Sequence, residues 1–339
     1  MKLSIGIVGL PNVGKSTLFK ILTKQEVHIA NYPFATIDPN VGVVAVPDER
    51  LDKLEEISKS KKKIPAVIEF YDIAGLVKGA NKGEGLGNQF LSHIKETQAI
   101  VVVLRVFKGE EIIHVENTVD PLRDMETILN ELILKDLDTI TKRTSKLESE
   151  AKSGDKKAAK NLEALKLIEE KLSQGRLVPD FSGEEINKEL QLLSSKKQIY
   201  LLNGEREDVS GGLTDKIKSL GADYIVADLG SAESLPELTE EAYKILNLIS
   251  FFTTGEDETR AWTIERGTLL PQASGVIHSD FEKKFIRAEV IGWRELLQAA
   301  HSAGSGQAGW TAAKQKGLVR IEGKEYVVQD GDVIVVRHG

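Results

Sequence analysis

The chain contains 339 residues, of which 41% are hydrophobic and 29% are charged, with a formal net charge of −7 and no cysteine. This length provides for two or three domains of about 150 residues each, and the composition is that of a soluble globular protein. Disulfides, thiolate metal sites and cysteine nucleophiles are excluded, and the negative charge gives no general attraction to nucleic acid. Apolar runs such as residues 99–104 are far shorter than the ~18 residues of a membrane span. Because residues 1–4 lead directly into a strand-like run, we expect a cytoplasmic protein without a signal peptide or membrane anchor.

A phosphate-binding motif follows the first predicted strand. Residues 3–8 form a short β-type run, residues 9–17 are GLPNVGKST, and a helical pattern comes next. Strand, G-x-x-x-x-G-K-[ST] and helix in this order are typical of a P-loop, whose backbone N–H groups and helix dipole bind phosphate. Lys15 is expected on the β- and γ-phosphates and Ser16 on Mg²⁺. The expected nucleotide-binding residues of this loop are Asn12, Val13, Gly14, Lys15, Ser16 and Thr17.

Two further motifs indicate the switch regions of a GTPase-like protein. Residues 67–71 are strand-like and are followed by the motif DIAG at residues 72–75. In this position Asp72 would hold Mg²⁺ through water, and the Gly75 N–H would sense the γ-phosphate. Thr36 is the best candidate for a threonine that closes on Mg²⁺, whereas the alternative, Thr23, lies inside the first predicted helix. The predicted metal ligands are therefore Ser16, Thr36 and Asp72.

Leu76 follows Gly75, at the place where Ras-like GTPases carry the glutamine that orients the attacking water. An apolar side chain cannot orient water, so either hydrolysis is slow or another group performs this task. The candidates are His114, Asn12 and a monovalent cation. His114 lies in a polar stretch after the predicted strand at residues 99–107, and a surface-loop histidine is the equally weighted alternative.

The motif that reads guanine, [NT]-K-x-D, occurs nowhere in the chain. The predicted strand at residues 199–202 ends instead in Asn203-Gly204-Glu205-Arg206. Without the aspartate that accepts two hydrogen bonds from guanine, the main discriminator for GTP is missing, so the sequence permits ATP. A further predicted strand, residues 224–229, leads into a loop that contains Ser231 and is expected to support the base.

Together these motifs resemble the YchF or Obg-like ATPase family, a translation-factor-related branch of the P-loop GTPases. The similarity lies in residues 9–17, NYPFATIDPN at 31–40, DIAGLVKGA at 72–80, GEGLGN at 83–88, RAWT at 260–263 and HSDFEKKFIRAE at 278–289. The resemblance implies ATP hydrolysis in preference to GTP, Mg²⁺, potassium beside Asn12, and association with ribosomes. The family carries an apolar residue at the place of Leu76 and reads the base with Asn-x-x-Glu. Asn203 and Gly204 are therefore carried over as nucleotide contacts, although Arg206 stands at the place of the family's glutamate.

The region between the predicted strands at residues 99–107 and 199–202 has a helical pattern. Its leucines and isoleucines recur at spacings of three and four, with a break at residues 153–155, which predicts an antiparallel coiled-coil hairpin. Two roles of this hairpin remain as alternatives: an arm that binds a partner, and a pair of helices that packs only on itself. The basic cluster of Lys152, Lys156, Lys157 and Lys160 at its tip favours contact with RNA or the ribosome.

From about residue 251 the pattern changes to short strands and turns. Strands are predicted at residues 261–264 and 285–290, with a final hairpin formed by 325–328 and 333–336. Residues 299–316 are rich in Gly, Ala and Ser and are predicted to form a mobile loop. The resemblance identifies this part as a TGS domain, a ubiquitin-like β-grasp fold found in RNA-associated proteins.

The sequence thus predicts an α/β protein. A P-loop NTPase domain at residues 1–250, with a helical coiled-coil insertion at about 118–196, precedes a C-terminal ubiquitin-like β-grasp (TGS) domain at 251–337. The predicted function is a Mg²⁺-dependent switch ATPase that binds ATP and the ribosome, with RNA contacted through the TGS domain or the arm. A GTPase of the same fold and a ribosome-binding scaffold with structural nucleotide are the alternatives.

Overall fold

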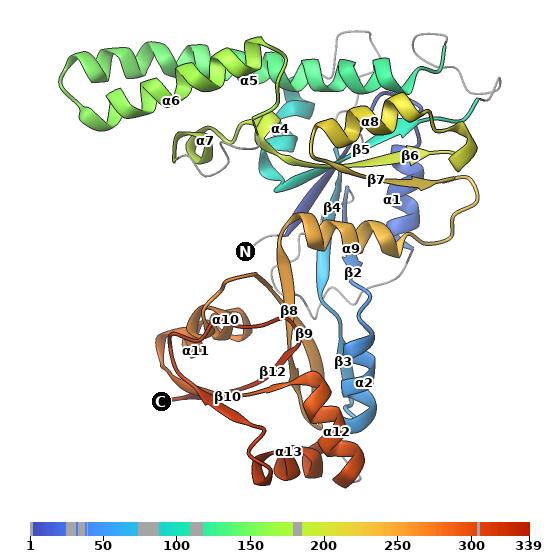
Figure 1. Ribbon diagram of the computed structural model, residues 1–339, viewed down its shortest axis with the longest axis vertical. Coiled ribbons are helices and arrows are strands. Elements are labelled where there is room, and N and C mark those ends of the chain that lie inside the picture. Colours follow the sequence, from blue (N-terminus) through green and yellow to red (C-terminus); the bar gives the residue numbers. More distant parts are fainter. Residues whose placement is uncertain are drawn as a thin grey trace. The chain divides into compact units, whose positions relative to one another are not determined.

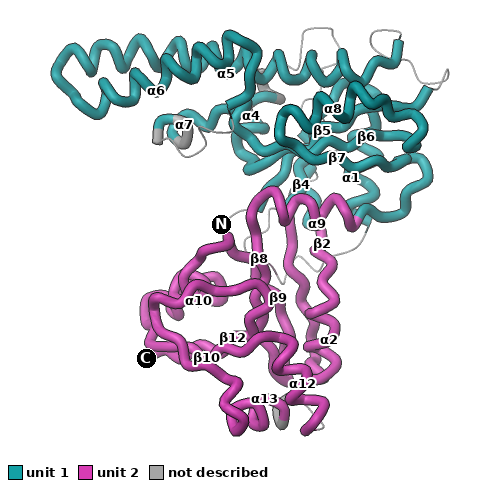
Figure 2. The backbone as a smooth tube through the Cα atoms, in the orientation of Figure 1, with its two compact units in different colours: residues 1–26, 34–43, 69–235 teal, residues 27–33, 44–68, 236–339 magenta. Residues whose placement is uncertain are grey.

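The computed structural model describes residues 3–24, 32, 38, 40–73, 88–108, 118–178, 185–303 and 306–339. The chain divides into two compact units (Figure 2). The first contains residues 1–26, 34–43 and 69–235, and the second contains residues 27–33, 44–68 and 236–339. Thr36, Gly75, Leu76 and His114 lie outside the described residues, so their predicted roles stay predictions. The predicted domain boundaries also stay predictions.

A mainly parallel sheet forms the centre of the first unit (Figure 1). Its strands are β1 (Ser4–Val8), β2 (Val41–Ala45), β4 (Val67–Asp72), β5 (Ala99–Arg105), β6 (Lys197–Asn203) and β7 (Asp223–Ala227). Among the described residues they lie in the order β2-β4-β1-β5-β6-β7, and the pairs from β4 to β7 are parallel. Every residue of β5 is buried, as expected for a central parallel strand. The carboxyl ends of these strands therefore meet at one edge of the sheet, where α/β proteins bind ligands.

The helices of the first unit include a long helical insertion between β5 and β6. They are α1 (Lys15–Thr23), α4 (Asn88–Glu96), α5 (Pro121–Lys152), α6 (Lys156–Ser173), α7 (Glu185–Leu190) and α8 (Gly211–Ser219). The first half of α5 packs on the sheet through residues such as Met125 and Leu132, and its second half packs against α6 through Ile140 and Leu147. The predicted helical hairpin, with its break at residues 153–155, is confirmed. In the described part of the chain, no helix combines the length and apolar character needed to cross a membrane.

The second unit is built on a mixed sheet that includes one strand from the N-terminal half of the chain. Its strands are β3 (Lys62–Ile64), β8 (Leu248–Thr254), β9 (Glu258–Glu265), β10 (Phe285–Gly292), β11 (Arg320–Glu322) and β12 (Asp332–His338). Its helices are α2 (Glu49–Ser58), α9 (Pro236–Ile245), α10 (Leu270–Ile277), α11 (Ser279–Lys283), α12 (Trp293–Ala303) and α13 (Gly306–Gln315). The sheet order is β11-β10-β12-β8-β9-β3, and β3 pairs with β9 in parallel. Its core includes Phe251, Ala288, Val290 and Ile334.

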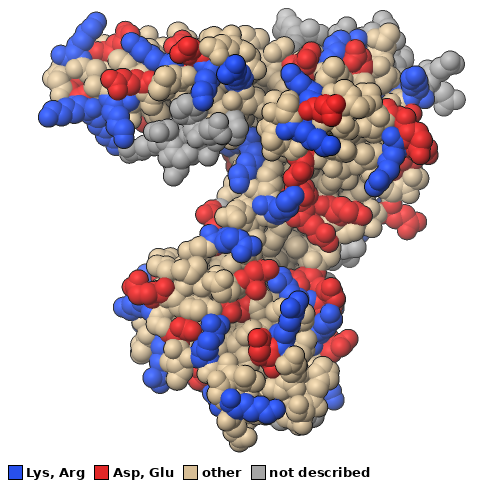
Figure 3. All heavy atoms as spheres, viewed as in Figure 1, with Lys and Arg blue, Asp and Glu red and all other residues tan. Residues whose placement is uncertain are grey.

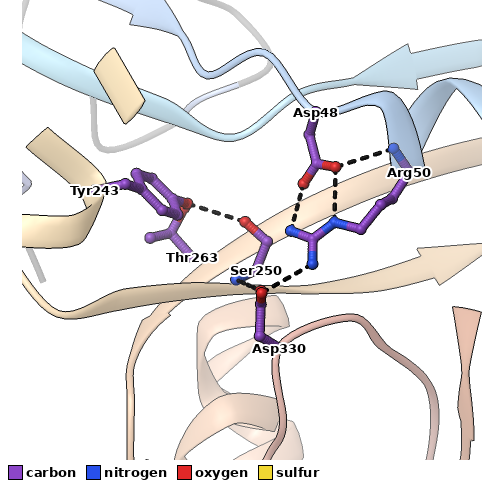
Figure 4. Close-up of polar contacts among 6 residues, drawn as sticks. All are labelled: Asp48, Arg50, Tyr243, Ser250, Thr263 and Asp330. Atoms are coloured by element: carbon purple, nitrogen blue, oxygen red, sulfur yellow. Dashed lines mark hydrogen bonds and ion pairs between the residues drawn. The ribbon is translucent and has the colours of Figure 1, made fainter. Parts of the chain in front are cut away.

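A charged network holds α2 against the C-terminal elements of this unit (Figure 4). Asp48 caps α2 and accepts hydrogen bonds from the Arg50 guanidinium, with an Nη2–Oδ2 distance of 2.7 Å. The same guanidinium forms an ion pair with Asp330 at 3.0 Å, and Asp330 also accepts the backbone N–H of Ser250. Tyr243 extends the network through the Ser250 hydroxyl at 3.2 Å. The start of α2 is thereby joined to the C-terminal segments that contain Asp330, Ser250 and Tyr243.

Two sequence predictions for the C-terminal part are wrong. Residues 299–316 contain the end of α12 and the whole of α13 rather than a mobile loop. Their small residues serve close helix packing, because Ala299, Ala300 and Ala313 are buried and a Cβ at Gly309 would lie 2.5 Å from the Cα of Ala300.

The second wrong prediction is the hairpin expected from residues 325–328 and 333–336. β12 pairs with β10 and β8, whereas residues near 326–328 bond to residues 268–270 through Leu270 N to Tyr326 O and Val328 N to Thr268 O. The Asp332 carboxylate accepts the Tyr326 hydroxyl at 2.8 Å and so stabilises a turn where the pattern predicted paired strands.

The packing of α13 predicts that Gly309→Ala destabilises the protein, because the added methyl group overlaps the backbone of α12. We expect a loss of about 1–3 kcal/mol in the free energy of unfolding, measured by urea denaturation. Gly323→Ala is the matched control, because a Cβ at Gly323 meets nothing within 4 Å. Equal stability of the two variants would contradict the close packing of α12 and α13.

Candidate nucleotide-binding site

The loop between β1 and α1 has the backbone conformation of an anion site. Asn12 has a φ of 64° and Gly14 a φ of 109°, and such left-handed turns direct successive N–H groups toward one side. A Cβ at Gly14 would lie 2.6 Å from Asn203 Nδ2, so the position requires glycine for both conformation and space. α1 has no side-chain cap and no acidic residue in its first turn. The positive end of its dipole is therefore uncompensated within the helix.

Lys15 lies within this loop. Its side chain is 8% exposed, and Nζ donates a hydrogen bond of 2.6 Å to the carbonyl oxygen of Leu10. Burial lowers the pKa of Lys15 to about 8, against the opposing attraction of the Asp72 carboxylate. A phosphate placed here would stabilise the ammonium form, because it adds negative charge at a desolvated amine.

Two side chains near this lysine carry oxygen atoms that can bind a metal. Ser16 follows Lys15 in the sequence, and Asp72 ends β4, the strand that pairs with β1. Ser16 is exposed in the first turn of α1, and Asp72 ends β4, where it pairs with Ile7 of β1 and is 6% exposed. No cluster of three or more His, Asp or Glu side chains suited to a metal occurs within the described ranges. The donor set fits Mg²⁺, which commonly takes one or two protein oxygens and completes its shell with phosphates and water.

Asn203 joins the phosphate loop to the loop that follows β7. It ends β6 and is 4% exposed. Its Nδ2 donates to the carbonyl oxygen of Val13 at 2.9 Å, and its Oδ1 accepts the N–H of Leu229 at 3.0 Å. Gly204 follows with a φ of 150°, where a Cβ would lie 2.7 Å from Val106 Cγ2. One buried amide thus fixes two loops at the carboxyl edge of the sheet.

The Ser231 hydroxyl is engaged within its own loop. It donates to Asp228 Oδ2 at 2.7 Å, and the Gly230 N–H donates to Asp228 Oδ1 at 2.9 Å. The Ser231 hydrogen bond, followed by that of Gly230, lowers the pKa of Asp228. Ser231 therefore shapes the loop, and any support that it gives a base would come through the backbone.

Arg206 begins a short 3₁₀ turn (Arg206–Asp208) on the surface. Its side chain is exposed, whereas Asn203, three residues earlier, is buried. The described part of the structure therefore brings Asn203 against Val13 and Gly14 of the phosphate loop, Gly204 follows Asn203 and lies against Val106, and Arg206 lies on the surface away from these contacts.

Three contributors were missed by the sequence analysis. Leu229 supplies the N–H that Asn203 accepts, Asp228 shapes the Ser231 loop, and the carbonyl oxygen of Asn40 accepts the Asp72 N–H at 2.9 Å. The Leu229 and Asn40 contacts use backbone atoms, so side-chain identity carries no signal for them. The spacing of Asp228 and Gly230 does indicate an Asx turn.

Asn203→Ala is expected to weaken binding of nucleoside triphosphate by about 10-fold or more, because the Val13 carbonyl and the Leu229 N–H lose their buried partner. Titration calorimetry with Mg²⁺ and nucleotide measures the change. Ser219→Ala is the control, since it removes an exposed hydroxyl that bonds only within the last turn of α8. Wild-type affinity in Asn203→Ala would refute the bridging role.

The chain is similar to known proteins over its full length. Residues 4–143 match the family model described as 50S ribosome-binding GTPase, and residues 248–339 match YchF-GTPase_C, described as a protein of unknown function. The chain is 46% identical to the ribosome-binding ATPase YchF of Bacillus subtilis, with 99% of each chain covered. It is 41% identical to Obg-like ATPase 1 of Gallus gallus, which covers 98% of this chain and 91% of the relative.

A solved structure shows the same architecture. The YchF GTPase of Schizosaccharomyces pombe superposes with a TM-score of 0.86 at 38% identity, covering 99% of this chain and 98% of that chain. The predicted combination of an α/β P-loop domain, a helical insertion and a further C-terminal domain is confirmed. The chain belongs to the YchF or Obg-like ATPase family of the ribosome-binding GTPase superfamily.

Proposed function

We propose that this protein is a Mg²⁺-dependent ATPase whose nucleotide state controls binding to the ribosome. The observation that carries the proposal is the buried Lys15, held in a glycine-turned loop whose conformation Asn203 fixes. The curated relatives in this family are named ribosome-binding ATPases, and their similarity extends over the full chain. A cytoplasmic location follows from the proposed partner.

The proposed reaction is attack of water on the γ-phosphate in line with the leaving ADP. Lys15 would neutralise charge on the β- and γ-phosphates, and N–H groups of residues 12–17 would surround the β-phosphate. The Gly75 N–H is proposed to contact the γ-phosphate. Because Leu76 cannot orient water, His114 is the proposed orienting group, assisted by potassium beside Asn12.

Ser16, Thr36 and Asp72 are the proposed protein ligands of Mg²⁺, with Asp72 acting through water. When bound, the ion would supply charge stabilisation between the β- and γ-phosphates. The Asp72 backbone is restrained by its bond to Asn40, and Ser16 is restrained by the first turn of α1. These restraints fix the backbone from which both proposed ligand side chains extend.

Base selection is proposed to rest on Asn203, Gly204 and the backbone of the Ser231 loop. Glu205 and Asp208 cap the 3₁₀ turn that begins at Arg206, and their side chains are exposed. No buried carboxylate follows Asn203 within this fully described turn, so the pair of acceptors that guanine needs is missing there. This favours ATP over GTP.

Competition between nucleotides tests the proposed activity. Unlabelled ATP should displace a fluorescent ATP analogue from the wild-type protein at lower concentration than GTP. Lys15→Ala should lower affinity by at least about 100-fold, because the variant has no buried ammonium group to donate charge-assisted hydrogen bonds to phosphate. Lys24→Ala, a position just after α1, is the control. Stronger displacement by GTP would favour the GTPase alternative, and binding without phosphate release in the presence of Mg²⁺, potassium and ribosomes would favour a scaffold.

The tip of the α5–α6 arm is the proposed contact with ribosomal RNA. Lys152, Lys156 and Lys160 are exposed there, and these three side chains have no ion-pair partner in the described part of the chain. Farther along the arm, Lys135 and Lys142 both pair with Asp138. Lys and Arg side chains are visible at the end of the arm (Figure 3). Unpaired lysines suit phosphate binding, because contact with RNA releases condensed counterions.

Replacing Lys152, Lys156 and Lys160 by alanine should weaken ribosome binding and flatten its dependence on salt. The slope of log K against log salt should fall by up to about 0.9 for each phosphate that the variant no longer neutralises. Cosedimentation with ribosomes at several salt concentrations measures both effects. The double variant Lys135→Ala/Lys142→Ala, which removes paired charges from the same arm, should bind nearly as the wild type does. Equally weakened binding in both variants would contradict a contact specific to the tip.

A further inference from the structure

The α5–α6 arm extends from the sheet of the first unit, and its base is the boundary between two hydrophobic cores (Figure 1). Leu132 of α5 packs in the core of the sheet, whereas the next residue, Ile133, packs in the core that α5 shares with α6. The segment that returns to β6 crosses the same boundary, because Leu192 packs in the arm core and Leu193 in the sheet core. The arm is therefore attached to the sheet at two places, through α5 and through the residues that precede β6.

Asp136 of α5 ties these two attachments to each other. Its side chain is fully buried, and Oδ1 accepts the backbone N–H of Leu193 at 2.8 Å. Oδ2 accepts both the N–H and the hydroxyl of Ser194, at 2.7 and 2.6 Å. Leu193 and Ser194 begin a short 3₁₀ turn, η3 (Leu193–Ser195). Loss of this carboxylate would leave two buried backbone N–H groups without their acceptor, which is costly.

Lys196, the residue after η3, ties the same segment to α4. Its Nζ donates to the carbonyl oxygen of Lys95 at 2.9 Å and also to that of Thr97. Lys95 lies in the last turn of α4, so the ammonium group satisfies a carbonyl at the helix end and complements the helix dipole. Burial lowers the pKa of Lys196 to about 8, against the opposing attraction of Asp136. α4 itself packs in the sheet core through Ile94.

We propose that Asp136, Ser194 and Lys196 form a clamp that sets the direction of the arm and thereby positions the lysines at its tip for RNA. The inference rests on the proposed ribosome contact and assigns these three side chains as positioning residues of that contact. The clamp acts at a distance, because Asp136 precedes Lys152 by sixteen residues of one helix, or about 24 Å at 1.5 Å per residue.

The number of attachments explains why the clamp matters. A long helix curves according to what it packs against, so α5 alone does not fix the direction of its second half. With the clamp, α5, α4 and the return segment are tied together where the two cores meet. Without the clamp, the arm keeps its own core and stays helical, but its direction varies. The ribosome would then have to select one direction among many, and this ordering cost would appear as weaker binding.

Distances between two spin labels test the clamp without ribosomes or nucleotide. The chain has no cysteine, so labels introduced at two engineered cysteines would be the only ones present. Glu163→Cys on α6 and Asp215→Cys on α8 place one label on the arm and one beside the sheet. Both side chains are exposed, so the labels disturb neither core. Electron paramagnetic resonance then measures how widely the distance between arm and sheet is distributed.

The distance distribution should be broader in Asp136→Asn and in Lys196→Met than in the wild type. Asp136→Asn places an amide group against backbone donors, and Lys196→Met keeps the length of the side chain but removes its donors. Asp138→Asn is the matched control, because it makes the same change two residues along α5, on an exposed aspartate. Circular dichroism checks that each variant keeps its helices. A wild-type distribution in both clamp variants would overturn the inference.

Cosedimentation with ribosomes links the clamp to the proposed contact. Lys196→Met should lower the affinity by about three- to tenfold, the cost of ordering the arm. The slope of log K against log salt should stay unchanged, because the lysines at the tip are all present; replacing those lysines flattens it instead. Lys197→Met, at the exposed neighbouring position, is the control and should bind as the wild type does.

The two measurements separate this inference from the proposed function. Wild-type ribosome affinity in Lys196→Met, together with a broadened distance distribution, would overturn the positioning role. A reduced salt slope in Lys196→Met would also overturn it, because it would make Lys196 a direct phosphate contact. A wild type that binds no ribosome would contradict the proposed function, and the distance distributions would still decide whether the clamp exists.

Discussion

The amide of Asn203 is the contact on which the candidate site depends. It satisfies the carbonyl of Val13 and the N–H of Leu229, two backbone groups from loops more than 200 residues apart in the chain. Buried backbone groups of this kind are costly when unpaired, so the amide fixes both loops together. The glycine at position 14 is part of the same arrangement, because a side chain there would collide with Asn203. The conformation of the phosphate loop therefore depends on Asn203, which is distant in sequence, as well as on the loop's own residues.

The second unit illustrates how distant segments are joined by charge and packing. β3 adds to the edge of a sheet whose other strands come from residues 248–338, and Arg50 binds Asp330 as well as its neighbour Asp48. Tyr32 joins the same unit through Arg260. Three parts of the N-terminal half therefore make contacts within a unit that is otherwise C-terminal. β9 thereby contacts two parts of the chain that precede β4, through its pairing with β3 and through the Arg260–Tyr32 contact.

The helical insertion combines two environments in one helix. The first half of α5 belongs to the core of the nucleotide-binding unit, and the second half belongs to the core that it shares with α6. A continuous helix transmits position along its length, since each turn is hydrogen-bonded to the next. Of the lysines proposed to bind RNA, Lys152 ends this helix, which also packs beside β5, whereas Lys156 and Lys160 lie on α6, which packs against its second half.

The sequence alone determined the order of the elements that carry the proposed nucleotide site, because that order is local. Consecutive residues around Lys15 indicate a strand, a glycine-rich loop and a helix in that order. Local patterns likewise predict the aspartate that ends β4 and the helical hairpin with its break. The tertiary structure decided what depends on distant partners. Residues 299–316 became packed helices because small side chains allow close approach to a neighbouring helix, although the same composition also suits a loop. The pairing of β12 and the contacts of Asn203, Arg50 and Tyr32 join residues far apart in the chain, and no local pattern specifies which of many distant groups will meet.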